Sequence, residues 1–155
     1  MNFRTASMDT YTKVMTIVFI IFFSVVIFAL VQSDQKFVFW PVSIMVAAIV
    51  TAYLMIPKID LEQGSLKIKN TFVDFQIPVK SIKNVELITK TGFNLRTFGI
   101  GGLFGYFGYF NGNDVWYVTN VRKKVKIQTE RKTYLISPEE PQKLINEIEK
   151  LKNNI

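Results

Sequence analysis

The chain has 155 residues and a formal net charge of +7, with 19 Lys and Arg against 12 Asp and Glu. It contains no cysteine and no histidine, which excludes disulfides, thiolate nucleophiles and cysteine metal sites and removes the commonest general base. We therefore predict no catalytic residue, no metal site and no cofactor, and we expect a protein that is not an enzyme.

The first third of the chain consists of two apolar runs, 14–31 and 37–56, which contain no charged residue. A helix needs roughly 20 apolar residues to cross the hydrocarbon layer of a membrane, and neither run has the polar stripe of a soluble core helix. Only residues 32–36 separate the runs. The pattern predicts a transmembrane helical hairpin in residues 1–57, with helices at about 13–32 and 37–56, and a folded domain in residues 58–155.

Residues at the ends of the runs indicate how the hairpin is oriented. Aromatic and basic residues typical of a membrane interface flank the runs: Tyr11, Lys13, Trp40, Tyr53 and Lys58. Arg4 and Lys13 precede the first run and Lys58, Lys67 and Lys69 follow the second, whereas only Lys36 lies between them. The positive-inside rule then predicts a multi-pass protein of the cytoplasmic (inner) membrane with both termini in the cytoplasm.

A cleaved signal peptide is the alternative interpretation of the first run. Its apolar stretch is longer than the usual 7–15 residues. The only candidate cleavage site, Ala29-Leu30-Val31, ends in a β-branched residue and does not fit the small-residue pattern. We therefore favour a retained helix.

From Lys58 onward the apolar residues alternate with polar ones, which is typical of strands. Ile59 and Leu61, then Leu66 and Ile68, form a hairpin pattern around the turn at 63–64. Further strands rich in β-branched and aromatic residues are expected at 72–77, 82–88, 115–121, 124–128 and 132–136. The pattern predicts about seven short strands.

The end of the chain predicts a helix. Ser137 is placed as the N-cap, Pro138 as the first helical residue and Glu140 as the third, which is a capping-box arrangement. Apolar residues then recur at helical spacing: Leu144, Ile145, Ile148, Leu151 and Ile155. An amphipathic helix of about 14 residues should cover an open end of the strands, which gives an α+β fold in which the helix plugs a small barrel or sandwich.

Three parts of the domain carry a resemblance to a known family: the run 77–85, the positions Arg96, Gly99 and 105–108, and the run 134–138. Together they resemble the bacterial PH-like (pleckstrin-homology-like) domains of small membrane proteins, over residues 58–151. The resemblance implies a PH-like small β-barrel of about seven strands capped by a C-terminal helix, in a cytoplasmic-membrane protein. It brings no known catalytic residue.

A block of five glycines and six aromatic residues occupies positions 98–110. It is not a phosphate-binding loop, because Phe104 stands where G-x-G-x-x-G needs its third glycine and no Gly-Lys-Ser/Thr follows. One interpretation is structural, with glycines in turns or bulges and the rings of Phe98, Phe104, Phe107 and Phe110 packed inside. In another, the block faces the membrane and Tyr106 and Tyr109 lie in the headgroup layer. A protein contact surface is the third.

Basic residues supply the other candidate contacts. Arg96 binds a phosphate or lipid headgroup in one interpretation and pairs with Asp74 or Glu86 in the other. The remaining cations cluster along a predicted hairpin, where they are either solvated or in contact with anionic lipid: Arg122, Lys123, Lys124, Lys126, Arg131 and Lys132. The acidic residues lie on separate predicted elements and form no metal or acid–base site.

These observations predict a non-enzymatic integral membrane protein whose cytoplasmic PH-like domain binds a protein partner or the anionic membrane surface. Nucleic acid is not expected as a partner, because the anchor restricts the domain to the bilayer. The alternative is a structural subunit of a larger membrane complex (transport, secretion or signalling) that uses the domain only for docking. The candidate contact residues are Arg96, Phe104, Tyr106, Phe107, Tyr109, Arg122, Lys123, Lys124 and Lys126.

Overall fold

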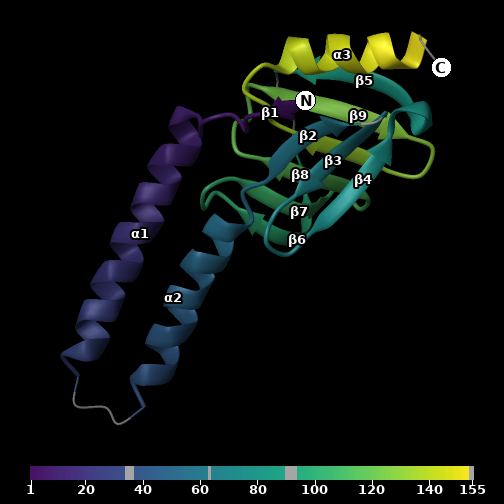
Figure 1. Cartoon of the computed structure of the whole chain (residues 1–155). Coiled ribbons are helices and arrows are strands. Elements are labelled where there is room, and N and C mark those ends of the chain that lie inside the picture. The colour runs from purple at the N-terminus through teal and green to yellow at the C-terminus, as the bar shows by residue number, and fades with distance from the viewer. Residues whose placement is uncertain (34–36, 63, 90–93, 154–155) are drawn as a thin grey trace.

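Two long helices project from a β-rich body in the computed structural model of the chain (Figure 1). The structure describes residues 1–33, 37–62, 64–89 and 94–153. Helices α1 (Thr10–Val31) and α2 (Phe39–Leu54) run side by side in opposite directions, and α3 (Pro141–Asn153) lies across the far end of the body. Lys36, in the turn of the expected hairpin, lies outside the described residues, as do Gln63 and Ile155.

The first sheet has the order β1-β2-β3-β4 and is antiparallel throughout. Its strands are β1 (Asn2–Phe3), β2 (Lys58–Glu62), β3 (Ser65–Lys69) and β4 (Asp74–Pro78). The short 3-10 helix η1 (Val79–Ser81) then leads the chain into the second sheet.

The second sheet has the order β5-β9-β10-β8-β7-β6. Its strands are β5 (Ile82–Ile88), β6 (Arg96–Gly101), β7 (Tyr106–Phe110), β8 (Asp114–Val118), β9 (Lys124–Thr129) and β10 (Thr133–Ile136). Strand β10 pairs in parallel with β8, and the other described pairs are antiparallel. Strand β6 forms one edge and lies beside the helices (Figure 1).

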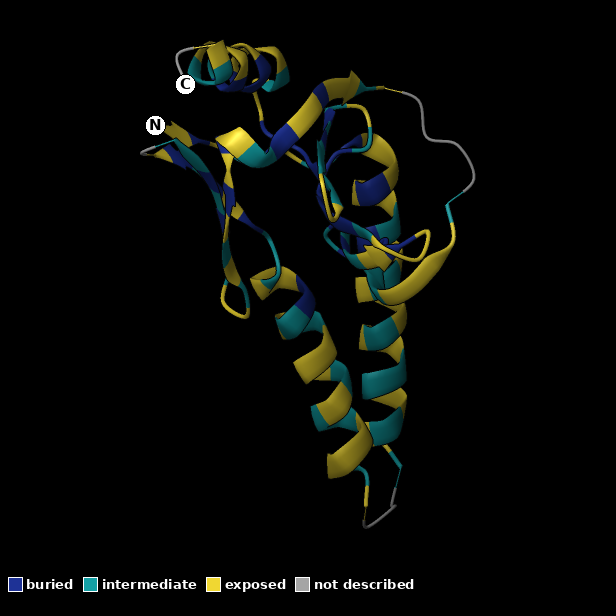
Figure 2. Ribbon diagram, turned by 90° about the vertical axis from the view of Figure 1, so that its right-hand side faces the viewer, coloured by how far each residue is buried: buried dark blue, intermediate teal, exposed yellow. Residues whose placement is uncertain are grey.

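A single main core joins the two sheets and α3. Ile59 and Leu66 of the first sheet pack with Val125 and Ile127 of the second, and Leu144 and Ile148 of α3 join the same cluster. Figure 2 shows the buried residues, in dark blue, concentrated in the body, in the first turns of α1 and at Ala52 of α2, whereas the rest of both long helices is exposed or half-buried. The alternation of buried and exposed residues along β2 and β3 is the one predicted from sequence.

The predicted α+β class is confirmed. Of the two expected arrangements the small barrel is wrong and the sandwich is closer to the structure, because the described strands form two separate sheets. Pro78 ends β4 and lacks the N–H that would continue pairing, and η1 turns the chain away before β5 begins. The strand count is also higher than the expected seven. The strands missed from sequence are β1, which has only two residues, and β6 and β7, which lie in the glycine-aromatic block.

The C-terminal helix begins later than predicted. It starts at Pro141 rather than Pro138, and the run before it is extended: Pro138 forms an antiparallel bridge with Thr5, and the Glu139 N–H donates to the Arg4 carbonyl at 2.8 Å. Ser137 is therefore not a helix cap. The predicted capping box is wrong because this segment pairs with the N-terminal residues instead.

Part of the glycine-aromatic block packs inside the body, as the structural interpretation expects, and part of it is exposed. Phe107 and Phe110 are buried, Phe104 is half-buried and Phe98 is 75% exposed. Gly99 and Gly108 lie opposite each other in the β6–β7 pair. A Cβ atom on Gly99 would lie 2.1 Å from the Phe107 carbonyl oxygen, and Gly99 has a φ of +128°. The two strands can approach this closely only because neither position has a side chain.

We predict that Gly99→Ala destabilises the fold by about 2–4 kcal/mol, because it adds a steric clash to an unfavourable φ. Gly112→Ala is the matched control: its φ is also positive, at +87°, but no atom lies within 4 Å of the added carbon, so it should cost about 1 kcal/mol. Urea unfolding in detergent micelles, followed by fluorescence of the buried Trp116, measures both. Equal losses would contradict the close approach of β6 and β7.

Candidate functional site

The residues before α1 connect the two sheets. In β1, Phe3 pairs with Ile59 of β2, and the Leu61 N–H donates to the Met1 carbonyl at 2.8 Å. Further along, the Ala6 N–H donates to the Ser137 carbonyl, also at 2.8 Å. Because Ser137 follows β10, this segment is bonded to both sheets within six residues.

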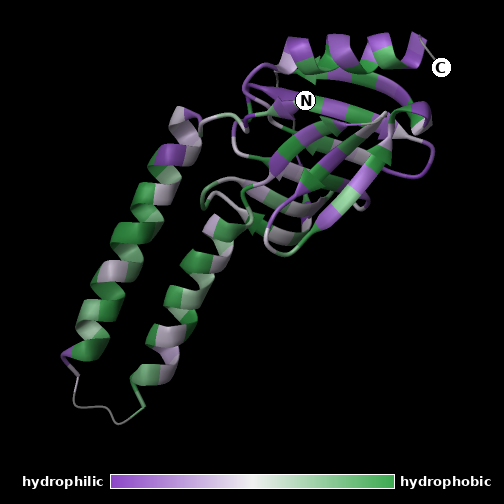
Figure 3. Ribbon diagram, viewed as in Figure 1, coloured by the Kyte–Doolittle hydropathy of each residue, from purple (hydrophilic) through white to green (hydrophobic). Residues whose placement is uncertain are grey.

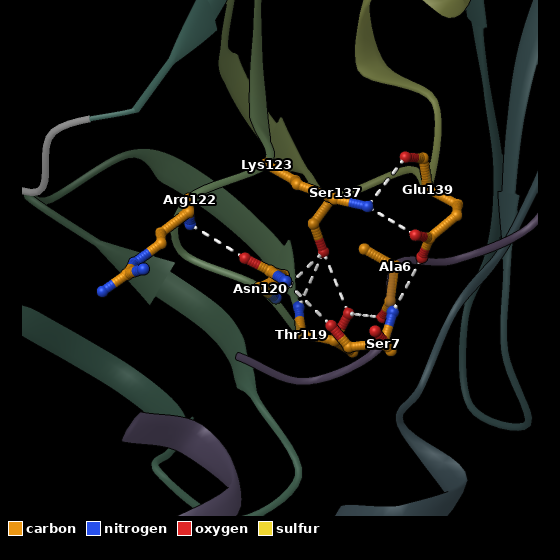
Figure 4. Close-up of polar contacts among 8 residues, drawn as sticks. All are labelled: Ala6, Ser7, Thr119, Asn120, Arg122, Lys123, Ser137 and Glu139. Carbon is orange, nitrogen blue, oxygen red and sulfur yellow. Dashed lines mark hydrogen bonds and ion pairs between the residues drawn. The ribbon is translucent and has the colours of Figure 1, made fainter. Parts of the chain in front are cut away.

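A buried hydroxyl network holds the same segment in place (Figure 4). The Ser137 Oγ accepts from the N–H of Thr119 at 2.8 Å and from that of Asn120 at 3.3 Å. The Thr119 hydroxyl donates to the Ala6 carbonyl at 2.6 Å, and the Asn120 amide donates to the Ser7 carbonyl at 2.9 Å. Ser137 and Thr119 are 0% and 2% exposed, so these bonds are shielded from water.

The polar contacts continue into the first turns of α1. Asp9 is the N-cap: its carboxylate accepts from the Thr12 N–H at 2.9 Å and from the Val121 N–H at 2.8 Å. One helical turn later, the Thr16 hydroxyl accepts from the Phe104 N–H at 2.9 Å. The start of α1 is thus bonded to the β8–β9 turn and to the β6–β7 turn.

Sequence reasoning missed this junction. Asp9 followed by Thr12 is an N-cap signal that could have placed the helix start correctly, three residues before the predicted boundary. Nothing in the sequence indicated that Ser137, 128 positions away from Asp9, would bond to the same segment, because such contacts depend on the tertiary fold.

Beyond the junction the two long helices are largely apolar (Figure 3), and residues 14–31 and 39–54 include no charged side chain. Within the described residues, α1 alone has the length and composition that a membrane crossing requires; α2, with 16 residues, is apolar but shorter. Large side chains on both helices are exposed, among them Ile21, Phe28 and Ile44. Burial against protein therefore does not account for this apolar surface.

The predicted basic cluster is dispersed in the structure. Lys123 forms an ion pair with Glu139, Lys126 pairs with Glu86 at 3.3 Å, and Arg122 is exposed. Lys124 is only 2% exposed and its Nζ lies 5.2 Å from the centre of the Trp116 ring; burial lowers the pKa of this amine. Lys124 therefore cannot contact a membrane surface in this conformation.

Arg96 is exposed at the start of β6. Neither expected partner is available: Asp74 pairs with Lys69 at 3.1 Å and with Lys67 at 3.7 Å, and Glu86 pairs with Lys126. Within the described ranges, no acidic residue forms an ion pair with Arg96. The interpretation in which this arginine pairs with a carboxylate is therefore wrong for Asp74 and Glu86.

The aromatic candidates divide between the interior and the helices. Phe107 is fully buried in the core, so it cannot be a surface contact. Phe104 packs edge-on against Tyr53 of α2, with ring centres 5.6 Å apart. Tyr106 is half-buried, and burial raises its pKa, whereas Tyr109 is 40% exposed, with Lys132 Nζ 5.7 Å from its ring centre. Tyr109 is the member of this set that remains open to solvent.

A cationic pocket that sequence reasoning missed lies where α2 meets the first sheet. Lys58 and Lys69 are directly opposite each other in the β2–β3 pair. With Tyr53, Ile56 and Thr71 they line a cavity of about 450 Å³. Like charges directly opposite each other repel, so this pocket favours an anion. Lys69 also pairs with Asp74, and this hydrogen bond lowers the pKa of the Asp74 carboxyl.

No group of acidic side chains within the described ranges could hold a metal ion. The arrangement instead offers cations next to the long helices: Lys58 and Lys69 lie in one pocket with Tyr53 of α2, and Arg96 lies in another with Phe19 and Phe23 of α1. Phe98, two residues after Arg96, is exposed. Such a surface can bind phosphate groups and lie against an apolar phase, but it holds no nucleophile and base within reach of each other.

We predict that Ser137→Ala costs about 1–3 kcal/mol of stability, because the buried N–H of Thr119 loses its acceptor. Ser7→Ala is the matched control, since Ser7 is exposed in the same junction and its carbonyl, rather than its hydroxyl, accepts the Asn120 bond. Urea unfolding in detergent micelles measures the difference. A loss for Ser7→Ala as large as that for Ser137→Ala would contradict the hydroxyl network.

Lys123 should also control the titration of Glu139. Hydrogen bonds from Lys123 and from the Ser7 N–H lower the pKa of Glu139, so the pair stabilises the fold above the ordinary carboxyl range and this contribution is lost as pH falls through the lowered pKa. In Lys123→Gln the pKa of Glu139 should rise, as measured by carbon-13 NMR of labelled glutamate. Lys143→Gln, which removes the partner of Glu140, should leave Glu139 unchanged.

Comparison with known proteins identifies a family. A family model described as "Bacterial PH domain" matches residues 58–152, which is more than half of the chain. No curated protein and no solved structure matches.

Proposed function

Because the chain belongs to the bacterial PH domain family, we propose that it is a non-catalytic binding module held at the cytoplasmic membrane by α1 and α2. PH-like domains commonly bind proteins or lipids. In this chain the domain would present its helix-facing side to the anionic bilayer surface and its remaining surface to a protein partner. Fold alone does not specify the ligand, so the proposal depends on the site.

The observation that carries the proposal is the junction before α1. The residues 1–9 are bonded to both sheets, and the domain follows α2. The start of α1 and the end of α2 therefore belong to one body, which must lie on one side of a membrane. A crossing by α1 alone would separate them. This supports a hairpin in which both helices cross or neither does, and the exposed apolar surface of both favours crossing.

The same junction supports retention of α1. Removal of a leader up to residue 31 would take away β1, the bond from Ala6 to Ser137 and the N-cap Asp9. Without them, the backbone of β2, the Ser137 carbonyl and the Val121 N–H would lose hydrogen-bond partners. The charges favour a cytoplasmic domain, since Arg4, Lys13 and Lys58 lie at the end of the hairpin that adjoins the domain.

Cysteine labelling tests this topology, because the chain has no cysteine of its own. Ser7→Cys and Asn146→Cys, both exposed on the domain side, should resist a membrane-impermeant maleimide in intact cells and react after permeabilisation. Gln32→Cys, at the opposite end of α1, should react in intact cells. The protein should also stay in the membrane after carbonate washing.

Two outcomes would contradict the proposal. Release of the full-length protein by carbonate would show that α1 and α2 do not anchor it in the membrane. Protection of Gln32→Cys until permeabilisation, together with that of Ser7→Cys, would place the whole hairpin on one side and exclude crossing.

A further inference from the structure

A groove lies between the two long helices and the edge of the second sheet. It is lined by Phe19 and Phe23 of α1, Ala48 of α2, and Arg96, Ile100 and Leu103 from β6 and the turn after it, and its volume is about 240 Å³. Most of this lining is hydrocarbon. The exception is Arg96, which is the one charged residue in an otherwise apolar lining.

The position of Arg96 in the groove depends on glycine. A Cβ atom on Gly101 would lie 3.3 Å from Arg96 Nη1 and 3.8 Å from its Cδ. The Arg96 side chain therefore extends towards Gly101 at the end of β6, where a larger residue would compete with it for space. At the far side, Gly102 lies against the helix, since a Cβ there would be 3.6 Å from the Phe19 ring.

The level of the groove along the helices places it within the reach of the hydrocarbon layer if the hairpin crosses. The turn after β6 lies against α1 at Phe19, and β6 itself lies close to the end of α2 that adjoins the body (Figure 1). Below the contact with Phe19, residues 20–31 of α1 extend for roughly 18 Å at 1.5 Å per residue. A bilayer core is about 30 Å thick. If the hairpin crosses, the hydrocarbon layer therefore reaches the groove and the exposed Phe98 beside it.

A guanidinium at this depth needs a counter-charge, because an unpaired charge inside or beside hydrocarbon is costly. The carboxylates expected to neutralise it are engaged with lysines: Asp74 with Lys67 and Lys69, and Glu86 with Lys126. The missing anion must then come from outside the described chain. Guanidinium groups bind phosphate oxygens through two parallel hydrogen bonds.

From this combination we infer that the groove binds one anionic phospholipid, with its phosphate on Arg96 and part of an acyl chain between Phe19, Phe23 and Ala48. A lipid with a net negative charge fits better than a zwitterionic one, because residues 58–155 carry 16 Lys and Arg against 10 Asp and Glu and would repel a choline group. The inference rests on the proposed insertion of the helices.

Full-length protein reconstituted in vesicles of phosphatidylcholine with a minority of phosphatidylglycerol tests the assignment. After extraction in mild detergent, native mass spectrometry should find phosphatidylglycerol retained in preference to phosphatidylcholine. Arg96→Gln should lower this retention about tenfold, since a hydrogen-bonded charge is removed, and Arg96→Lys should lower it less. Arg131→Gln, at an exposed arginine of the β9–β10 turn, should leave it unchanged.

A second pair of variants tests the groove without touching the charge. Ala48→Phe fills the groove from α2 and should also abolish the retained lipid, whereas Ala47→Phe, exposed on the same helix but outside the groove lining, should not. Both positions face away from the core, so neither variant should impair folding.

The outcomes that would overturn the inference are distinct. Three outcomes would each show that the groove is not a lipid site, without contradicting the proposed hairpin. They are equal retention of the two lipids, a loss in Arg131→Gln equal to that in Arg96→Gln, and no effect of Ala48→Phe. Displacement of the lipid by millimolar glycerol phosphate would indicate a site for soluble phosphate instead. Release of the reconstituted protein by carbonate washing would remove the lipid site and the proposed function together.

Discussion

The hydrogen bonds of the Met1–Asp9 segment determine how the rest of the molecule is arranged. On one side the segment pairs with β2 of the first sheet. On the other side it bonds to Ser137 and Thr119, which follow strands of the second sheet. The segment therefore links the two sheets by hydrogen bonds. It ends at Asp9, whose carboxylate both begins α1 and accepts from Val121. The direction in which α1 leaves the body is set there. The side on which α2 returns follows from it, because β2 begins only three residues after α2 ends.

The glycine-aromatic block then fits the second sheet against the helices. Gly99 and Gly108 let β6 and β7 approach closely, Phe107 anchors the pair in the core, and the turn after β6 reaches α1 at Thr16 and Phe19. Phe98 and Tyr109 of the block remain exposed, and aromatic side chains of this kind are accommodated at a membrane interface. The same block therefore supplies both core residues and exposed residues, because successive residues of a strand point to opposite faces.

Sequence patterns predicted the elements that have a regular period. The alternation around Ile59 and Leu66 identified β2 and β3, the helical spacing of Leu144 and Ile148 identified α3, and the uncharged runs identified both long helices. The family resemblance identified at the sequence level is confirmed by the match over residues 58–152. Boundaries set by local chemistry alone, such as the predicted cap at Ser137, were less accurate.

The misses have a common physical origin. Strand β6 has no readable period because glycines interrupt it, and β1 is too short to show one. Lys124 reads as a surface cation, yet its side chain is covered by the sheet and lies over Trp116. The separate sheets arise from one proline and one turn of 3-10 helix after β4. The burial of Lys124 and the pairing of β1 with β2 depend on residues far apart in the chain, which a sequence window does not contain.

The attachment of the domain at two points has a mechanical consequence. The body is joined to α1 through Asp9 and Thr16 and to α2 through the three residues 55–57, with Phe104 packed on Tyr53. A body tethered by one linker can swivel freely, but one fixed to two neighbouring helices turns with them. Membrane helices tilt when the bilayer around them becomes thinner. If both helices cross the bilayer as proposed, a change in its thickness would therefore rotate both β-sheets and change the direction in which their surface faces.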